Sequence, residues 1–269
     1  MKKLFLCLLT LLSWVTMRSE EKHIVVIIPS YNNARWCEKN LLSVFGQNYT
    51  NYHVIFTDDC SSDNTYELVT ALVKKYNKED RVTVIHNKER CKALKNLINM
   101  IYRCIDTDII LTLDGDDWLF NKNVFSYINN AYADPNIWIT YGQYVEVNAK
   151  DEYFRGFNKP IPDFVVKYGL FRSQYEAFSH LRTFYAGLFK KIRLEDLMFE
   201  GEYFAMSWDL AFMIPMIEMA RYHFKFIPDF LYVYNGTNDI NDHKVSKELQ
   251  QLHDRIVRSR QPYHALEKL

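Results

Sequence analysis

The 269-residue chain has few of the residues that build glycine-rich nucleotide-binding loops, since it contains only 8 glycines. No Gly-x-Gly-x-x-Gly follows its first apolar run, and no glycine-rich loop ends in Lys-Ser or Lys-Thr. A dinucleotide oxidoreductase needs the first pattern for close backbone approach to a pyrophosphate, and a P-loop nucleotidase needs the second. These absences argue against both classes, and phosphate binding here has to use a metal ion instead.

The chain also has no excess charge of either sign, because 33 Lys and Arg residues balance 33 Asp and Glu residues. We therefore expect no broad nucleic-acid-binding surface. The 5 cysteines lack zinc-finger spacing, and their positions do not define a disulfide. No internal repeat, low-complexity tract or Pro- or Ser-rich linker divides the sequence, and its length fits one domain with a substantial core.

The first half of the chain alternates apolar strand-like runs with helix-like segments. Strands are predicted at 24–28, 53–57, 82–86 and 108–113, and helices at 34–47, 65–76 and 93–102. This alternation predicts an α/β domain with a mostly parallel central sheet flanked by helices. In such sheets, ligands bind outside the carboxyl ends of the strands. Three polar runs fall at that edge, at 29–33, 58–63 and 114–117.

Three carboxylates follow the fourth apolar run, at Asp114, Asp116 and Asp117. Acids at the tip of a buried strand repel one another, and a divalent cation is the usual means of offsetting that repulsion. Carboxylates without nearby His or Cys favour Mg²⁺ or Mn²⁺, and such an ion indicates a phosphate-bearing ligand. An acidic turn without metal is the alternative, because Asp-Gly-Asp is also favourable turn chemistry.

The chain resembles the family 2 glycosyltransferases in three landmarks, which have the order and spacing of that family: Val-Ile-Ile-Pro-Ser-Tyr-Asn at 26–32, Asp-Asp-Cys-Ser-Ser-Asp at 58–63 and Leu-Asp-Gly-Asp-Asp at 113–117. Cys60 stands where glycine is frequent in that family, which a turn tolerates at some cost in strain. The resemblance implies the fold called GT-A, as a single domain over 22–262. Its Rossmann-like nucleotide-sugar half would cover 22–120 and its acceptor half 121–262.

The resemblance also implies roles for residues at the sheet edge. Those expected to line the nucleotide pocket are Pro29, Tyr31, Asn32, Asp58, Asp59 and Asp114. Those expected to hold the Mn²⁺ or Mg²⁺ that bridges the donor diphosphate are Asp116, Asp117 and His243. The expected donor is a nucleoside-diphosphate sugar, a UDP-sugar above others, and the acceptor is a glycan, lipid or protein. Turn formation is the alternative for Asp58, and helix capping is preferred for Asp63.

The second half has to supply the acceptor site and the general base. On position alone Asp209 is a helix cap before the apolar helix predicted at 210–220. The resemblance makes Asp209 the base of an inverting displacement, with Glu202 as second choice, and a helix N-terminus favours the ionised carboxylate. Arg182 either binds a phosphate or carboxylate or forms a structural salt bridge. Strands at 136–144 and 230–235 and a helix at 245–260 complete the prediction.

Residues 1–19 combine Lys2 and Lys3 with a short apolar stretch, which predicts a signal peptide or short signal anchor. We therefore expect a secretory-pathway lumen or membrane-associated location, with membrane contact through the N-terminus, and a cytoplasmic enzyme is the alternative. Two other functions remain open. A sugar-1-phosphate nucleotidyltransferase would need a glycine-rich basic loop that 29–33 lacks, and the intact acids Asp114 and Asp209 argue against a non-catalytic sugar-nucleotide-binding module.

Overall fold

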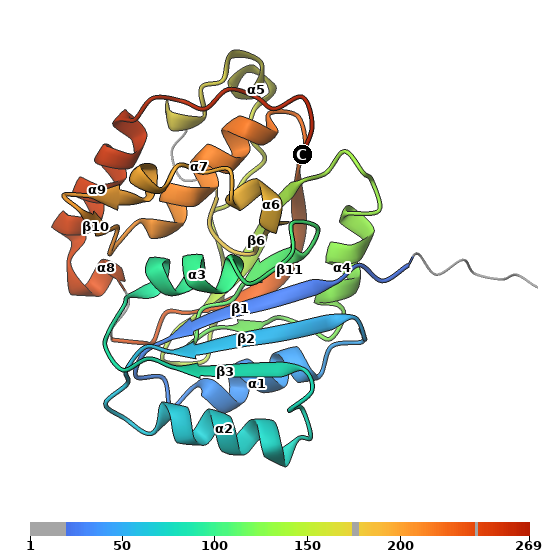
Figure 1. Cartoon of the computed structure of the whole chain (residues 1–269), viewed down its shortest axis with the longest axis vertical. Coiled ribbons are helices and arrows are strands. Elements are labelled where there is room, and N and C mark those ends of the chain that lie inside the picture. The colour runs from blue at the N-terminus through green and yellow to red at the C-terminus, as the bar shows by residue number, and fades with distance from the viewer. Residues whose placement is uncertain (1–19, 174–177, 240–241) are drawn as a thin grey trace, which may run out of the picture.

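The computed structural model describes residues 20–173, 178–239 and 242–269 (Figure 1). The strands in these ranges are β1 (Ile24–Ser30), β2 (Tyr52–Asp58), β3 (Val82–His86), β4 (Ile109–Thr112), β5 (Trp118–Leu119), β6 (Ile139–Val147), β7 (Tyr153–Arg155), β8 (Arg182–Tyr185), β9 (Met198–Phe199), β10 (Glu202–Tyr203) and β11 (Phe224–Asn235). The helices are α1 (Cys37–Phe45), α2 (Thr65–Lys75), α3 (Ala93–Ile101), α4 (Val124–Ala131), α5 (Asp163–Tyr168), α6 (Ala186–Phe189), α7 (Trp208–Ala220), α8 (Asp242–Val245) and α9 (Lys247–Ser259).

Most strands join one sheet in the order β3-β2-β1-β4-β8-β6-β11-β5, with β7 paired to β6. The first four strands along the chain are parallel to one another, and β6 is parallel to β11. The predicted α/β domain with a mostly parallel sheet is confirmed. β8 was not predicted. It lies antiparallel between β4 and β6 and thereby joins the two expected halves in one sheet.

Alternating residues of β1 pack against two layers of helices. Val25 and Ile27 belong to a core cluster with α3 and α7, whereas Ile24, Val26 and Ile28 belong to a second cluster with α1, α2 and α4. Figure 1 shows α1 and α2 on one side of β1–β3 and α3 on the other. Because both faces of the strand are buried, its sequence is a continuous β-branched run rather than an alternating pattern.

Two strand boundaries differ from the prediction for reasons connected with proline. Pro29 lies inside β1, where it pairs with Thr57, instead of ending the strand. β11 begins at Phe224 rather than at position 230, and its register with β6 shifts between Ile227 and Phe230. This irregularity accommodates Pro228, which lacks the N–H that a regular sheet ladder requires.

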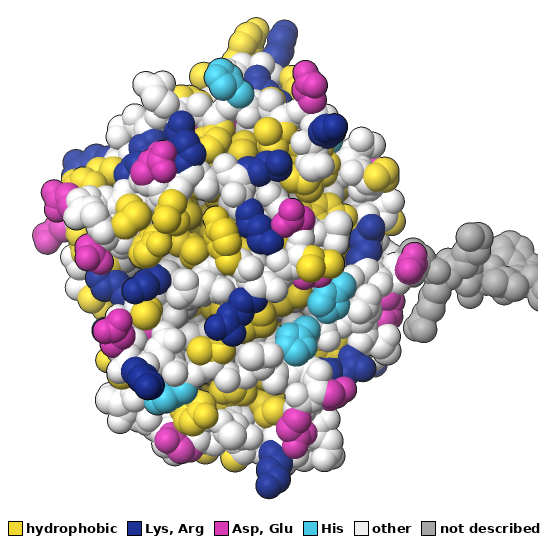
Figure 2. All heavy atoms as spheres, in the orientation of Figure 1, with side chains coloured by type: hydrophobic (Ala, Val, Ile, Leu, Met, Phe, Trp, Pro, Cys, Tyr) yellow, Lys and Arg dark blue, Asp and Glu magenta, His cyan; other side chains and the backbone are white. Residues whose placement is uncertain are grey.

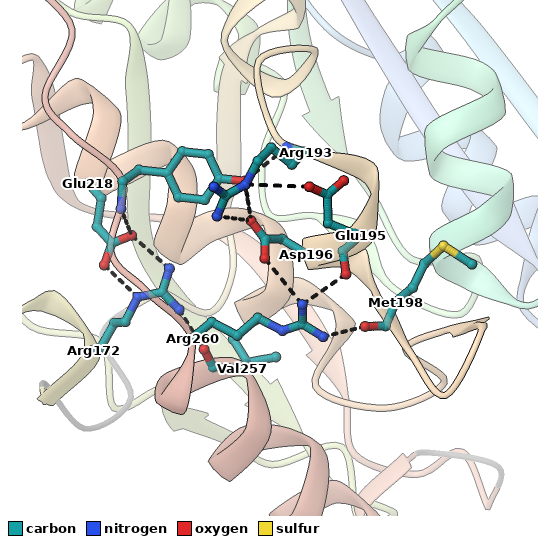
Figure 3. Close-up of polar contacts among 9 residues, drawn as sticks. Arg172, Arg193, Glu195, Asp196, Met198, Glu218, Val257 and Arg260 are labelled. Atoms are coloured by element: carbon teal, nitrogen blue, oxygen red, sulfur yellow. Dashed lines mark hydrogen bonds and ion pairs between the residues drawn. The ribbon is translucent and has the colours of Figure 1, made fainter.

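The chain after α9 is held by buried polar contacts, because the Tyr263 amide donates to Glu218 of α7 at 3.0 Å and a second set of contacts surrounds Asp196 (Figure 3). Arg172 donates to both carboxylate oxygens of Glu218, from Nε at 2.7 Å and Nη2 at 2.8 Å. Asp196 accepts hydrogen bonds from Arg260 Nη1 at 3.2 Å and the Tyr263 hydroxyl at 2.6 Å. These contacts hold the chain after α9 against the domain.

Lys and Arg side chains are interspersed with Asp and Glu on the face shown in Figure 2, as the balanced composition leads one to expect. Among the residues that the structure describes, no helix is both long enough and apolar enough to cross a bilayer. The signal peptide or anchor predicted at 1–19 lies outside the described residues.

Candidate active site

The structure brings the three predicted polar runs to one edge of the sheet. β1 pairs with β2 and with β4, so that Ser30 lies opposite Asp58 and Ile27 opposite Thr112. The register is extended beyond the strands, because the Asp59 amide donates to the Ser30 carbonyl at 2.8 Å. The carboxyl ends of these parallel strands therefore form the expected ligand-binding edge.

The loops after β1 and β2 are joined through Asn32. Its backbone N–H donates to Ser61 Oγ at 2.9 Å, and its side-chain Oδ1 accepts from the Ser62 amide at 2.8 Å. Cys60 has a φ of 61°, so the strained conformation predicted at this glycine-like position is confirmed. The Arg90 guanidinium lies 3.7 Å from the centre of the Tyr31 ring, which places a cation beside one predicted nucleotide contact.

Asp58 and Asp59 have protein partners at this edge. Asp58 is fully buried, and its Oδ2 accepts from the Ser61 amide at 3.2 Å and contacts His86 Nδ1 at 2.9 Å. Asp59 accepts from the backbone amides of Cys91 and Lys92, each at 2.7 Å. Asp59 therefore orders the segment that leads into α3. Nucleotide contacts by Pro29, Tyr31, Asn32, Asp58 and Asp59 stay predictions.

Asp63 has the local structural role preferred for it. Its Oδ1 accepts from the Thr65 amide at 3.0 Å and from the Thr65 hydroxyl at 2.5 Å. Its Oδ2 accepts from the Ala34 amide at 3.1 Å. This carboxylate therefore connects the start of α2 with the loop after β1.

The turn 114–117 is clamped from both sides of the sheet edge. Asn40 of α1 donates its amide Nδ2 to the carbonyls of Asp114 at 2.9 Å and Asp117 at 2.8 Å. On the other side, the Tyr232 hydroxyl accepts from the Asp114 amide at 3.2 Å and donates to Asp117 Oδ2 at 2.6 Å. The Asn235 amide donates to Asp117 Oδ1 at 2.7 Å. This framework fixes the carboxylates before any ligand arrives.

The acids of this turn carry negative charge that is costly to bury. Burial raises the pKa of Asp114 to about 6, with Arg182 opposing the rise and Asp116 and Asp209 adding to it. Burial also raises the pKa of Asp117 well above its ordinary value, and the charges of Asp116 and Asp114 raise it further. A cation placed among these carboxylates would relieve that repulsion.

One group of ligand atoms is arranged to receive such a cation. Asp114, Asp117 and His180 each offer an atom, and these atoms lie within 4.8 Å of one another. Burial and the neighbouring Arg182 hold the pKa of His180 well below its ordinary value, so its ring is neutral. Nδ1 of this ring lies 3.1 Å from Arg182 Nη2 and accepts a hydrogen bond from it, so the carboxylate oxygens of Asp114 and Asp117 remain as the ligand atoms, and such oxygens suit Mn²⁺ or Mg²⁺.

The predicted metal ligands are placed in three different ways. Asp117 is fully buried and already accepts two hydrogen bonds, and Asp116 Oδ2 accepts from Asn238 Nδ2 at 2.7 Å. The side chain of His243 lies outside the described part of the chain. His180 was not among the candidates, because nothing in its local sequence distinguishes it from an ordinary buried histidine. Metal binding by Asp116, Asp117 and His243 stays a prediction.

Arg182 connects the acidic turn with the predicted base. Its side chain is 2% exposed, and Nη1 donates to Asp209 Oδ2 at 3.2 Å while Nη2 lies 3.7 Å from Asp114 Oδ2. Asp209 is the second residue of α7 and does not cap it, because the N-cap position is that of Ser207. The Asp209 side chain is 28% exposed and accepts from the Leu210 amide at 3.0 Å. Glu202 is exposed in β10 and has none of these contacts. The geometry therefore favours Asp209 over Glu202 as a group acting beside the acidic turn.

Sequence comparisons agree with this arrangement. Residues 25–193 match the family model described as glycosyl transferase family 2. A Rickettsia conorii protein named as an uncharacterized glycosyltransferase, RC0461, is 31% identical over 130 residues, which are 48% of this chain and 20% of that protein. The Escherichia coli UDP-Glc:alpha-D-GlcNAc-diphosphoundecaprenol beta-1,3-glucosyltransferase WfgD is 30% identical over 124 residues, which are 46% of each protein. The matches thus span less than half the length of these relatives.

Solved structures share the fold. Residues 1–349 of Staphylococcus aureus TarS in complex with UDP-GlcNAc superpose with a TM-score of 0.58 at 18% identity, covering 84% of this chain and 61% of that one. The mannosyltransferase PcManGT from Pyrobaculum calidifontis, in complex with GDP-Man and Mn²⁺, superposes with a TM-score of 0.61 at 19% identity, covering 89% and 65%. The implied GT-A fold is thereby confirmed. Since the family model matches more than half of its residues, the chain belongs to glycosyl transferase family 2.

Proposed function

We propose that this family 2 glycosyltransferase moves a sugar from a metal-bound nucleoside-diphosphate sugar to an acceptor hydroxyl, with inversion at the anomeric carbon. The observation that carries the proposal is the single guanidinium of Arg182, which contacts both Asp114 and Asp209. Asp209, the proposed base, therefore lies on the same guanidinium as Asp114, which is predicted to face the donor. UDP-sugars are the expected donors, in keeping with the UDP-GlcNAc complex of TarS and the UDP-Glc in the name of WfgD.

The donor would lie along the carboxyl edge of β1, β2 and β4. Tyr31 and Asp59 would contact the nucleotide, and Asp114, Asp116 and Asp117 would hold the cation. A bound Mn²⁺ or Mg²⁺ supplies a Lewis acid that stabilises the charge developing on the departing diphosphate. The PcManGT complex contains GDP-Man together with Mn²⁺, which supports a metal-bound donor in this fold. The acceptor would be a glycan, lipid or protein hydroxyl.

Asp209 would act as the general base. It lies in the first turn of α7, and its side chain is partly exposed, so that an acceptor hydroxyl can reach it. The acceptor oxygen would form a bond to the anomeric carbon while Asp209 takes its proton. The bond from that carbon to the diphosphate oxygen would break on the opposite face, and the diphosphate would leave with the electron pair. One displacement inverts the centre and needs no covalent intermediate.

Replacing Asp209 by Asn tests the role of this carboxylate. We expect Asp209→Asn to slow the hydrolysis of a UDP-sugar, measured as the UDP released, by about 100-fold or more. A positioned general base accelerates a reaction by about 100-fold or more. Its affinity for UDP in the presence of Mn²⁺ should stay near that of the wild type. Asp163→Asn is the matched control, because Asp163 is an exposed acid in the first turn of α5.

The two outcomes separate the possible roles of Asp209. Full activity of Asp209→Asn would remove it as the base. Loss of UDP binding together with activity would make it a structural residue, because the change would then disturb the donor side of the site. Asp163→Asn should behave as the wild type in both measurements, which controls for loss of a helix-start carboxylate.

A further inference from the structure

Arg182 reaches the site from β8, the strand that lies antiparallel between β4 and β6. It is the first residue of β8, and it lies opposite Thr112 of β4 and Tyr141 of β6. Because β8 runs antiparallel to β4, its beginning lies beside the carboxyl end of β4, where the acidic turn starts. The guanidinium therefore enters the carboxylate group from the sheet itself, on a backbone held by ladders on both sides.

Each nitrogen of the Arg182 guanidinium has a different partner. Nη1 donates to Asp209 at 3.2 Å, and Nε lies 3.5 Å from Thr112 Oγ1. Nη2 donates to His180 Nδ1 at 3.1 Å and lies 3.7 Å from Asp114. The planar fork thus makes several directed contacts at once, which a lysine ammonium on a flexible stem cannot reproduce.

His180 fixes the direction of this fork. Because its Nδ1 accepts a hydrogen bond, the neutral ring carries its proton on Nε2. The ring stacks on Tyr232 with centroids 4.4 Å apart and planes 8° apart, and the Tyr232 hydroxyl bonds Asp117. A continuous set of contacts therefore runs from the predicted base to the far acid of the metal turn.

We infer that Arg182 is a positioning residue that couples the cation site to the base: it orients Asp209 and at the same time partly neutralises Asp114. The inference rests on the proposed function. It assigns to Arg182 two opposing effects, one that favours turnover and one that weakens cation binding. Holding Asp209 favours turnover, because a base must be kept within about an ångström of its productive position. A fixed positive charge close to Asp114 repels an incoming divalent cation, which weakens its binding.

A structural role alone would give a different result. If Arg182 only stabilised the fold, its removal would lower metal binding, turnover and stability together. Coupling instead predicts that removing the charge lowers turnover while it strengthens cation binding. The sign of the change in Mn²⁺ affinity therefore distinguishes the two roles.

The test compares four forms of the full chain: the wild type, Arg182→Met, Arg182→Lys and Arg172→Lys. Arg172 is a matched control, because its guanidinium is also largely buried and bound to a carboxylate, that of Glu218 in α7, away from the acidic turn (Figure 3). Mn²⁺ binding is measured by calorimetry, alone and with UDP. Turnover is measured as nucleotide release from UDP-glucose or GDP-mannose, whichever the wild type hydrolyses, and folding by urea unfolding.

We expect Arg182→Met to bind Mn²⁺ about tenfold more tightly than the wild type, because a nearby cationic charge is removed. Arg182→Lys keeps the charge and loses the fork, so Mn²⁺ affinity should stay within about threefold while kcat falls about tenfold or more at nearly constant KM. Arg172→Lys should leave both readouts unchanged and alter only the unfolding midpoint.

Two results would overturn the coupling. One is wild-type kcat in Arg182→Lys, which shows that the fork orients nothing needed for turnover. The other is weaker Mn²⁺ binding in Arg182→Met, in step with its unfolding midpoint, which is the signature of a purely structural arginine. A wild-type chain that binds neither Mn²⁺ nor UDP would instead overturn the proposed function, and the coupling with it.

Discussion

Gly115 lies where the acidic turn has no room for a methyl group. A Cβ at this position would lie 2.5 Å from Ser30 Oγ, 2.7 Å from Ser30 Cβ and 2.8 Å from Asn33 Nδ2. Non-bonded carbon atoms prefer about 3.5–4.0 Å, so Gly115→Ala has to separate the two loops by about 1 Å. Ser30 and Asn33 are both buried and cannot move into solvent. The perturbation therefore falls on the turn that carries Asp114 and Asp116.

We expect Gly115→Ala to lower the free energy of unfolding by about 1–3 kcal/mol, the usual cost of overpacking. In a chain of this size that corresponds to a fall in Tm of about 2–4 °C for each kcal/mol. The shift also moves the acids relative to their clamps, and a 1 Å misplacement costs about 100-fold in rate. Urea unfolding tests the first effect. Nucleotide release from a UDP-sugar, measured on the same preparation together with Mn²⁺-dependent UDP binding, tests the second.

Gly201 provides the control for this substitution. Its φ is 83° and a Cβ there would meet nothing within 4 Å, so Gly201→Ala introduces backbone strain without crowding. We expect it to cost about 1 kcal/mol in stability and to leave UDP binding unchanged. A Gly115→Ala variant with wild-type unfolding midpoint and wild-type UDP affinity would refute the close-packing argument.

Two further predictions concern the carboxylates of Glu218 and Asp196, whose contacts Figure 3 shows. Glu218→Gln leaves the largely buried Arg172 guanidinium without its carboxylate and should cost about 3 kcal/mol in urea unfolding, with nucleotide release per folded molecule unchanged; an unaltered midpoint would contradict it. Burial acts to raise the pKa of Asp196, but the Tyr263 hydroxyl and the guanidiniums of Arg193 and Arg260 outweigh it and lower that pKa below 3.8. Its stabilisation is therefore present above the unfolded-state pKa and is lost as the pH falls through the lower folded-state pKa. Asp196→Asn should flatten the pH dependence of the unfolding free energy between about pH 5 and pH 3, and equal slopes for variant and wild type would contradict this.

The first four strands could be predicted because their signal is local. Each is a short apolar run, and β1, β2 and β4 are buried along nearly their whole length, whereas β3 is buried at Val82 alone. β3 nevertheless has the bounds that its sequence predicts. Helix starts are less well encoded. The predicted helix at 34–47 begins at Cys37 in the structure, because the Asn33 carbonyl accepts from the Trp36 and Cys37 amides in a turn.

β8 could not be predicted, because nothing local defines it. It has four residues, and its place between β4 and β6 depends on pairing with strands that are distant in sequence. The contacts of Arg182 follow from that insertion. Asp114 and Asp209 could be identified as candidates from the sequence, but the partner of Arg182 could not. The structure shows that Arg182 forms ion pairs with both of these acids.

The roles of acids at the β2 end were also beyond sequence reasoning. Asp58 and Asp59 have the expected positions, but their partners come from His86, Cys91 and Lys92, a segment for which the sequence predicts only a strand end and a helix start. Likewise, His180 reaches the acidic turn through a stack on Tyr232, which lies 52 positions later in the chain. Such contacts require the tertiary structure.

The proposed donor site can be tested by calorimetric titration of the full chain with UDP and GDP, each with and without Mn²⁺. We expect one nucleotide, UDP above GDP, to bind with an affinity that depends on Mn²⁺, and Asp114→Asn to remove this dependence in a folded protein. A folded wild-type chain that binds neither nucleotide under either condition would contradict the donor site, and the turn at 114–117 would then be an acidic turn without a metal.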